Sequence, residues 1–392
     1  MMIIKSILDN DLYKFTQQQA VLERFPDVDV SYRFTNRSPD MIFSQEAFDS
    51  LKMNVDNLQF LKLTKEEIDY VRDIPFFKPM YVEYLRNFKF DPSCVTLNLT
   101  ADVQLELDIA GKWHETILFE VPLLALISEI YFQHMDTDWN HDRQDIVAKL
   151  KANLLEDYLY GDFGTRRRRN VRSQDDVVAS MKGKPGFVGT SNVYFAMKHG
   201  VKPLGTIAHE FFMAVSALEG LRHANRHALN HWVAVYGSDL GIALTDTFGT
   251  EAFFEDFDLR LSNLFRGLRH DSGDPLEFTD KAIAHYEKMG IDPKTKTILF
   301  SDGLDCLTAL RIAKYCSGKV KFAFGIGTDF TNDYLNSDEG KKSKPMNIVI
   351  KLRTCNGIGV VKLSDSPGKA TGDADALRVA KWTFYGTSLD AV

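Results

Sequence analysis

Short apolar runs alternate with amphipathic helical patterns between about residues 186 and 345, and few folds accommodate this rhythm. Most runs have His, Asp or Gly close behind them, as in KPLGTIAHE, LGIALTDTFG, FRGLRHDSGDP, KTILFSDGLD and KFAFGIGTDF. A repeated strand, polar tip and helix is typical of parallel βα units, whose ligands bind at the carboxyl ends of the strands. We predict an α/β barrel rather than an open sheet, because five consecutive tips are polar and no single GxGxxG loop dominates.

The first 118 or so residues follow a different pattern, with the period of two that half-buried strands show. Residues 30–37 alternate in this way, and every odd position from Val95 to Ile109 is apolar. Gly111 interrupts the alternation, which resumes from Trp113 to Phe119. We therefore predict a strand-rich region with a long antiparallel hairpin that turns near residues 110–112.

These patterns divide the chain into three parts. Residues 1–118 form a strand-rich N-terminal domain, and residues 119–345 form the catalytic α/β barrel. Residues 346–392 contain two further strands around Asn356-Gly357 and are predicted to return to the N-terminal domain.

The composition excludes several classes of protein. A formal charge of −7 argues against a general nucleic-acid binder, whose phosphate contacts need a surplus of Lys and Arg. The most apolar stretch, Val121 to Ile127, is too short to cross a membrane. The N-terminus lacks the apolar core of a signal peptide, and the four cysteines form no CxxC pair. We expect a cytoplasmic enzyme with reduced thiols.

Three glycine-containing motifs of the barrel region are candidate ligand sites. Two carboxylates beside a glycine turn, in Asp271-Ser-Gly-Asp-Pro275, suit Mg²⁺ or ribose hydroxyls, although Asp274 as a helix cap is the alternative. The glycines of the segments 301–305 and 324–329 allow backbone N–H groups to approach a phosphate, although a tight turn needs glycine anyway.

Histidines and arginines offer further candidates. His209 ends an apolar run and begins a helix, which would place its imidazole at the mouth of the barrel rather than inside it, although a lone histidine is usually structural. The histidines at 223, 227 and 231 have metal-ligand spacing but no carboxylate motif, so we interpret them as structural. The run Arg166–Arg169 has two interpretations. Either the four arginines form a solvated surface, or one of them binds a substrate carboxylate through two hydrogen bonds while Phe163 provides an aromatic surface for the substrate.

Nine segments, in content and order, resemble the nicotinate phosphoribosyltransferase family. They are DLYKFTQQ, SYRFTNRS, DFGTRRRR, FVGTSN, GTIAHEFF, ALTDTFGT, RHDSGDP, SDGLD and FGIGTD. The resemblance implies an irregular TIM-like α/β barrel of the type II phosphoribosyltransferases, packed with a strand-rich α+β N-terminal domain. It also implies conversion of nicotinate and phosphoribosyl pyrophosphate to nicotinate mononucleotide for NAD salvage, with Mg²⁺ and with ATP as co-substrate.

The resemblance also implies roles for individual residues. His209 matches the histidine that ATP phosphorylates. The ring-stacking and substrate-binding positions are Phe163 and Arg166, and Tyr13 matches a tyrosine that covers the ring from the other subunit in related dimers. The positions around the 5′-phosphate and the ribose, together with late basic residues near phosphate, are Gly303, Gly325, Gly327, Thr328, Asp246, Arg269, Asp271, Lys351, Lys362 and Lys369.

Ser191 distinguishes two substrates. Related nicotinamide enzymes carry an aspartate at this position, whereas a Ser hydroxyl can donate to the nicotinate carboxylate. We therefore expect nicotinate, and not nicotinamide, as the substrate. The alternatives are nicotinamide or quinolinate phosphoribosyl transfer and a non-catalytic phosphate-binding barrel; a metal-dependent hydrolase would need an HxH pair, which the sequence lacks.

Overall fold

A computed structural model describes residues 2–139, 144–336, 340–366 and 368–386 of the chain. These residues form two compact units, each assembled from discontinuous segments. Unit 1 comprises residues 1–21, 32–205 and 326–351, and unit 2 comprises residues 22–31, 206–325 and 352–392. The sequence-based division into three parts follows chain order instead and remains a prediction.

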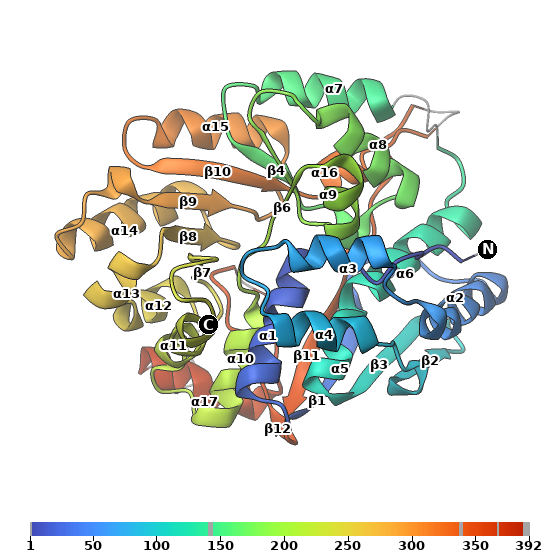
Figure 1. Cartoon of the computed structure of the whole chain (residues 1–392), viewed down its shortest axis with the longest axis horizontal. Coiled ribbons are helices and arrows are strands. Elements are labelled where there is room, and N and C mark those ends of the chain that lie inside the picture. Colours follow the sequence, from blue (N-terminus) through green and yellow to red (C-terminus); the bar gives the residue numbers. More distant parts are fainter. Residues whose placement is uncertain (1, 140–143, 337–339, 367, 387–392) are drawn as a thin grey trace. The chain divides into compact units, whose positions relative to one another are not determined.

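Unit 2 contains the series of parallel strands that the apolar runs predict. Its strands β7 (Ile242–Leu244), β8 (Gly267–His270), β9 (Thr297–Phe300) and β10 (Lys321–Ile326, all but its last residue) are neighbours in the order β10-β9-β8-β7. Figure 1 shows them side by side, with α14 and α15 alongside. The helices of this unit are α10 (His209–Glu219), α11 (Ala224–Tyr236), α12 (Thr250–Asp256), α13 (Leu259–Leu264), α14 (Pro275–Lys288), α15 (Cys306–Cys316) and α17 (Ala374–Tyr385).

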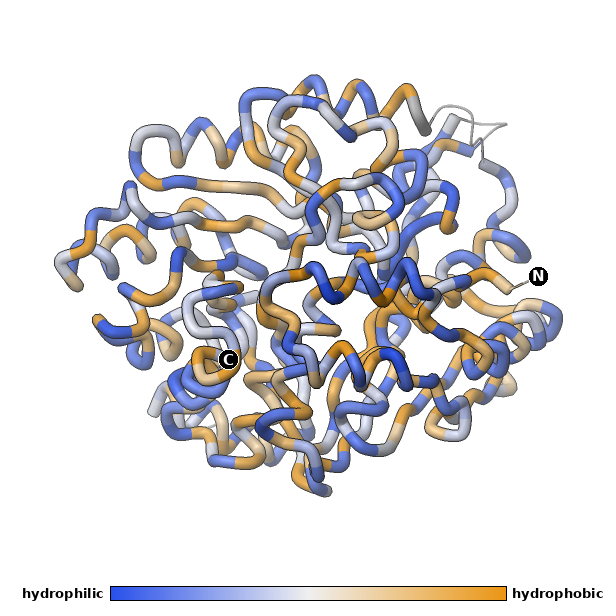
Figure 2. Tube along the Cα trace, in the orientation of Figure 1, coloured by the Kyte–Doolittle hydropathy of each residue, from blue (hydrophilic) through white to orange (hydrophobic). Residues whose placement is uncertain are grey.

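Helix α14 shows how a helix beside these strands buries one face. In α14 the buried residues are Phe278, Thr279, Ala282, His285 and Tyr286, which recur at helical spacing. Hydrophilic and hydrophobic residues accordingly alternate over short distances along the helices (Figure 2). Because the core holds the strands in place, the residues just beyond β7, β8 and β9 are fixed at one edge of the sheet.

Unit 1 contains a second set of parallel strands. Strand β4 (Tyr160–Asp162) pairs with β5 (Phe187–Thr190), and β5 pairs with β6 (Lys202–Pro203), with α8 (Val171–Met181) and α9 (Val193–His199) as the connecting helices. The other helices of this unit are α2 (Gln45–Asn57), α3 (Lys65–Arg72), α4 (Pro79–Asn87), α5 (Trp113–Thr116), α6 (Glu120–His134), α7 (Gln144–Leu154) and α16 (Thr328–Thr331), and α1 (Leu12–Arg24) begins here. No helix among the described residues is long and apolar enough to cross a membrane.

The predicted N-terminal hairpin exists, but its turn is elsewhere. Strand β2 (Val95–Leu99) pairs antiparallel with β3 (Leu105–Lys112), so the turn lies at residues 100–104 and not at 110–112. Residues 113–119, predicted as a strand, are helical. The paired residues Leu97 and Leu107 are both odd-numbered, so the turn does not change the parity of the apolar positions. The alternation therefore runs through the turn without a visible break.

The remaining predicted strands are present. Strand β1 (Asp29–Asn36) covers the first alternating segment, and its Tyr32–Asn36 part belongs to unit 1. Strands β11 (Ile348–Cys355) and β12 (Ile358–Gly359) form the expected antiparallel pair. Positive φ angles of 48° and 76° at Asn356 and Gly357 suit the tight hairpin turn between them.

Candidate functional site

His209 lies at the centre of a polar cluster in unit 2. It is the first residue of α10, and its side chain is 18% exposed. Its Nδ1 is 3.0 Å from Oγ1 of Thr247, and its Nε2 is 3.0 Å from Oδ2 of Asp271 and 3.0 Å from Nζ of Lys362. We name this group, together with Asp246 and Arg269, the histidine cluster.

The carboxylates of the histidine cluster follow two neighbouring strands. Asp246 comes after β7, and its Oδ2 accepts hydrogen bonds from Ser272 at 2.6 Å and lies 3.1 Å from Nζ of Lys362. Asp271 comes directly after β8, and it accepts a hydrogen bond from Ser301 at 2.7 Å and pairs with Arg269 at 3.2 Å. The adjacent strand ends therefore bring Asp246 and Asp271 together, and Lys362 joins them although it is 153 positions from His209 in the chain.

The charges of this cluster favour ionised acids and a neutral imidazole. Burial raises the pKa of Asp271, but Arg269 and His209 outweigh it and hold this pKa well below the usual value. His209 and Lys362 likewise lower the pKa of Asp246 against the effect of burial. Burial and the Lys362 ammonium lower the pKa of His209, so its imidazole is neutral near pH 7. A neutral imidazole carries a lone pair that can act as a nucleophile.

Part of the histidine cluster can hold a cation. Ligand atoms of His209, Asp246 and Asp271 lie within 4.8 Å of one another, although the Lys362 ammonium already sits beside two of them. Oδ1 of Asp246 is buried and accepts no hydrogen bond from any described residue. Because Mg²⁺ prefers oxygen ligands, the two carboxylates suit it better than the imidazole does.

The other predicted residues of unit 2 lie in or near strand ends. Gly303 follows β9 with a φ of 56°, a left-handed conformation that favours glycine. The neighbouring Asp302 pairs with Lys369 at 3.1 Å, so the structure brings this lysine to the Gly303 turn. Gly325 lies within β10. In the same DSGDP motif, Asp274 is the cap of α14, as the alternative interpretation of that residue predicted.

A second cluster, in unit 1, gathers around Glu120, the first residue of α6. The buried Lys14 pairs with Glu120 at 2.5 Å, and Arg166 pairs with it at 3.4 Å. Oη of Tyr13 lies 3.5 Å from the same carboxylate. Burial raises the pKa of Glu120, but Lys14 and Arg166 outweigh it and lower this pKa. Two predicted substrate-binding residues, Tyr13 and Arg166, thus meet within one chain.

Asp11 and Ser191 extend this second cluster. Ser191 donates a hydrogen bond from Oγ to Oδ1 of Asp11 at 2.6 Å, and the backbone N–H of Leu12 donates to the Ser191 carbonyl at 2.8 Å. Asp11 is 3% exposed. We name the set Asp11, Tyr13, Lys14, Glu120, Arg166 and Ser191 the Glu120 cluster. Sequence reasoning missed Asp11 and Glu120; Asp11 begins one of the matching segments, whereas no pattern pointed to Glu120.

The four consecutive arginines have different environments. Arg168 is buried and makes two hydrogen bonds of 2.7 Å to Asp9, and Arg169 is buried with its guanidinium 3.6 Å from the Phe132 ring centre. The interpretation of the run as a solvated surface is therefore wrong for both, because neither side chain reaches solvent. The side chain of Arg166 is 46% exposed, so it remains accessible to a ligand.

Glycine permits a close approach near Phe163. The backbone N–H of Phe163 donates a hydrogen bond to the Ile326 carbonyl at 2.8 Å. A Cβ at Gly327 would lie 3.2 Å from the Phe163 carbonyl oxygen, so a side chain there would crowd the backbone. Gly327 precedes Thr328, the first residue of α16, and both belong to unit 1. Lys351 lies in β11.

The three histidines with metal-ligand spacing contact carboxylates of the protein instead. His223 pairs with Asp256 at 2.8 Å, and both His227 and His231 contact Glu219, at 3.5 and 2.5 Å. These partners agree with the structural interpretation of all three.

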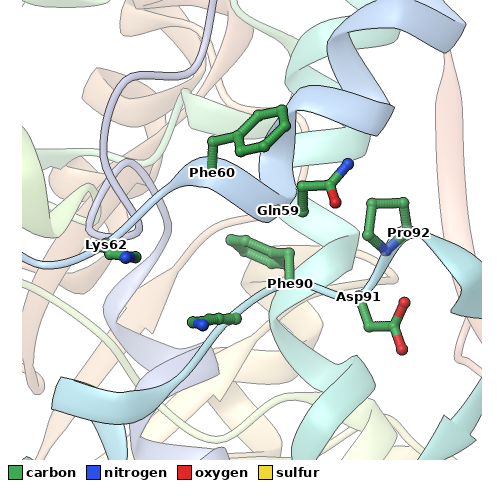
Figure 3. Close-up of a pocket in the computed structure, with 7 residues that line it drawn as sticks. Gln59, Phe60, Lys62, Phe90, Asp91 and Pro92 are labelled. Atoms are coloured by element: carbon green, nitrogen blue, oxygen red, sulfur yellow. The ribbon is translucent and has the colours of Figure 1, made fainter.

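A pocket of about 530 Å³ lies elsewhere in unit 1 (Figure 3). Its lining residues are Gln59, Phe60, Lys62, Lys89, Phe90, Asp91 and Pro92. None of them is a predicted site residue. Asp91 is the cap of a short helix, where its Oδ1 accepts a hydrogen bond from the backbone N–H of Ser93 at 3.0 Å.

Comparisons with known proteins agree with the geometry. The model of the nicotinate phosphoribosyltransferase (NAPRTase) family matches residues 158–387, and the model of its N-terminal domain matches residues 8–128. The nicotinate phosphoribosyltransferase of Methanosarcina mazei is 50% identical over 99% of this chain and 100% of its own length.

Solved structures agree as well. The crystal structure of a putative nicotinate phosphoribosyltransferase from Saccharomyces cerevisiae has a TM-score of 0.95 and 39% identity, covering 99% of both chains. That of the Porphyromonas gingivalis enzyme has a TM-score of 0.92 and 37% identity, covering 97% of this chain and 100% of its own. These likenesses confirm the predicted α/β fold class.

Proposed function

The chain belongs to the nicotinate phosphoribosyltransferase family, and we propose that it converts nicotinate and phosphoribosyl pyrophosphate to nicotinate mononucleotide and pyrophosphate. We further propose that ATP hydrolysis drives this reaction through a phosphohistidine at His209, that the product enters NAD salvage, and that the enzyme is a cytoplasmic homodimer. The observation that carries the ATP coupling is the neutral, partly exposed His209 imidazole beside Lys362 and Asp271.

In this proposal, the histidine cluster serves the phosphates and the ribose. A nitrogen of His209 attacks the γ-phosphorus of ATP, the P–N bond forms, and ADP leaves with the electron pair of the broken P–O bond. The Lys362 ammonium, 3.0 Å from Nε2, offsets the charge that the imidazole gains. Asp246 and Asp271 would hold Mg²⁺, which supplies neutralisation of the donor's pyrophosphate charge when it is bound.

In the same proposal, the Glu120 cluster binds nicotinate. Arg166 grips the nicotinate carboxylate, and Tyr13 and Phe163 contact the two faces of the ring. The ring nitrogen attacks C1 of the ribose as the bond to pyrophosphate breaks. Positive charge develops on the sugar, so the ionised Asp246 and Asp271 stabilise the transition state electrostatically.

One observation favours nicotinamide as a second candidate substrate. Asp11 places a carboxylate one hydrogen bond away from Ser191, and an ionised acid suits an amide better than another acid. Incubation with nicotinate, nicotinamide or quinolinate, each with the sugar donor and Mg²⁺, with and without ATP, tests the proposal by product identity. We expect nicotinate mononucleotide, formed faster with ATP; exclusive formation of another mononucleotide, or no product, would contradict the proposal.

A further inference from the structure

The backbone holds Asp11 and Ser191 in a fixed relation. Asp11 pairs with Asn192 in an isolated β-bridge, and the next residue, Leu12, donates its N–H to the Ser191 carbonyl. Ser191 in turn donates its own N–H to the Asp162 carbonyl at 2.7 Å. The 2.6 Å hydrogen bond between the two side chains therefore does not depend on a flexible loop.

The surroundings of Asp11 nearly balance in charge before any substrate arrives. Glu120 is matched by Lys14 and Arg166, and Arg168 is matched by Asp9. Burial raises the pKa of Asp11, although the Ser191 hydroxyl and Arg166 act in the opposite direction. The charged and titratable groups that face Asp11 are Tyr13, Glu120, Asp162, Arg166 and Arg168. A substrate carboxylate would add one negative charge to this set.

The hydroxyl of Ser191 has one proton and cannot serve two acceptors at once. When Asp11 is ionised, this proton points to Asp11, and Ser191 offers a ligand only its lone pairs. Lone pairs repel a carboxylate and accept an amide N–H. When Asp11 is neutral, its own proton can go to Ser191, and the hydroxyl proton then becomes available to a substrate carboxylate.

We infer that Asp11 is a specificity-determining residue that takes up a proton from solvent when nicotinate binds, and donates it to Ser191 so that Ser191 can donate to the substrate carboxylate. This inference rests on the proposed function. The only covalent change is the O–H bond that forms on Asp11 as the corresponding bond of a solvent or buffer acid breaks, and the proton returns to solvent when the product leaves. An amide substrate binds the ionised form and needs no proton.

The pH dependence of the Michaelis constants tests the inference. The KM for nicotinate should rise with pH by up to about tenfold per pH unit above the pKa of Asp11, while the KM for nicotinamide stays flat. In Asp11→Asn, the amide donates to Ser191 at every pH, so the KM for nicotinate should lose this slope. Asp69→Asn, which removes a half-exposed acid of the same unit, should keep the wild-type profile. A wild-type slope in Asp11→Asn would overturn the inference.

Calorimetry on the unmodified protein makes the test independent of whether the variant folds. Nicotinate is titrated in two buffers of different protonation enthalpy, with pyrophosphate and Mg²⁺ present, from about pH 6 to about pH 9. Proton uptake should rise with pH toward one proton per nicotinate. Binding without uptake over the whole range would overturn this inference and leave the proposed function standing, whereas absence of both binding and product formation would contradict the proposed function itself.

Discussion

In the histidine cluster, the carboxylates come from the ends of two neighbouring parallel strands, whereas the Glu120 cluster joins segments that are 107 and 180 residues apart in the chain. The acids also behave differently. Cationic partners lower the pKa of Asp246 and Asp271, whereas burial raises the pKa of Asp11. A regular sheet edge thus holds two acids whose surroundings favour the ionised form, whereas the irregular cluster holds an acid whose burial favours the neutral form.

Removing the charge of Asp271 should give the largest change in activity. In Asp271→Asn, the partner of Arg269, His209 and Ser301 loses its charge, and kcat/KM should fall by about 10²- to 10³-fold. Steady-state kinetics measure this. Asp274→Asn is the matched control, because asparagine is an equally good helix cap, and it should keep nearly full activity. Equal losses in the two variants would mean that the motif acts only as a turn.

Unit 1 should lose stability as pH rises, because it buries Glu129. Burial raises the pKa of Glu129 from 4.5 to about 7, so the folded state favours its protonated form. This contribution is complete below pH 4.5 and is lost as pH rises to about 7, which costs roughly 3 kcal/mol of unfolding free energy. Urea unfolding of Glu129→Gln should show a smaller decline over this range. An unchanged decline would assign the effect to other groups.

A substitution in the Glu120 cluster should change the KM for nicotinate and not the KM for the sugar donor. Arg166→Gln should raise the KM for nicotinate by about 10- to 100-fold with little change in the KM for the sugar donor. The neighbouring Arg167→Gln should change either constant much less, because that side chain approaches Asn347, at 3.4 Å. Comparable changes in both Michaelis constants would contradict the separate roles of the two clusters.

The smallest expected effect is a change in the pKa of His209. The Lys362 ammonium lowers the pKa of His209, so Lys362→Met should raise this pKa. An NMR titration of the histidine ring protons measures the change, with Lys369→Met as a control that pairs with Asp302 instead. A lower or unchanged pKa would mean that Lys362 does not face the ring in solution.

Regular topology explains what the sequence predicted well. Asp271 and His209 stand just after apolar runs, so the βα pattern placed them at an edge of the sheet, and the structure brings their side chains within 3.0 Å. The hairpin turn at 100–104 was misplaced because it preserves the parity of the flanking strands. Arg168 was misjudged because its partner, Asp9, is 159 residues away. No local pattern reports a contact of that kind.

The rate of product formation with and without ATP, compared between the wild-type protein and His209→Asn, tests the assigned role of the histidine cluster most directly. We expect ATP to accelerate the wild-type reaction and to leave the variant at the slow, ATP-independent rate, with nicotinate mononucleotide as the product of both. Stimulation of the variant by ATP to the wild-type extent would contradict a phosphohistidine at this position.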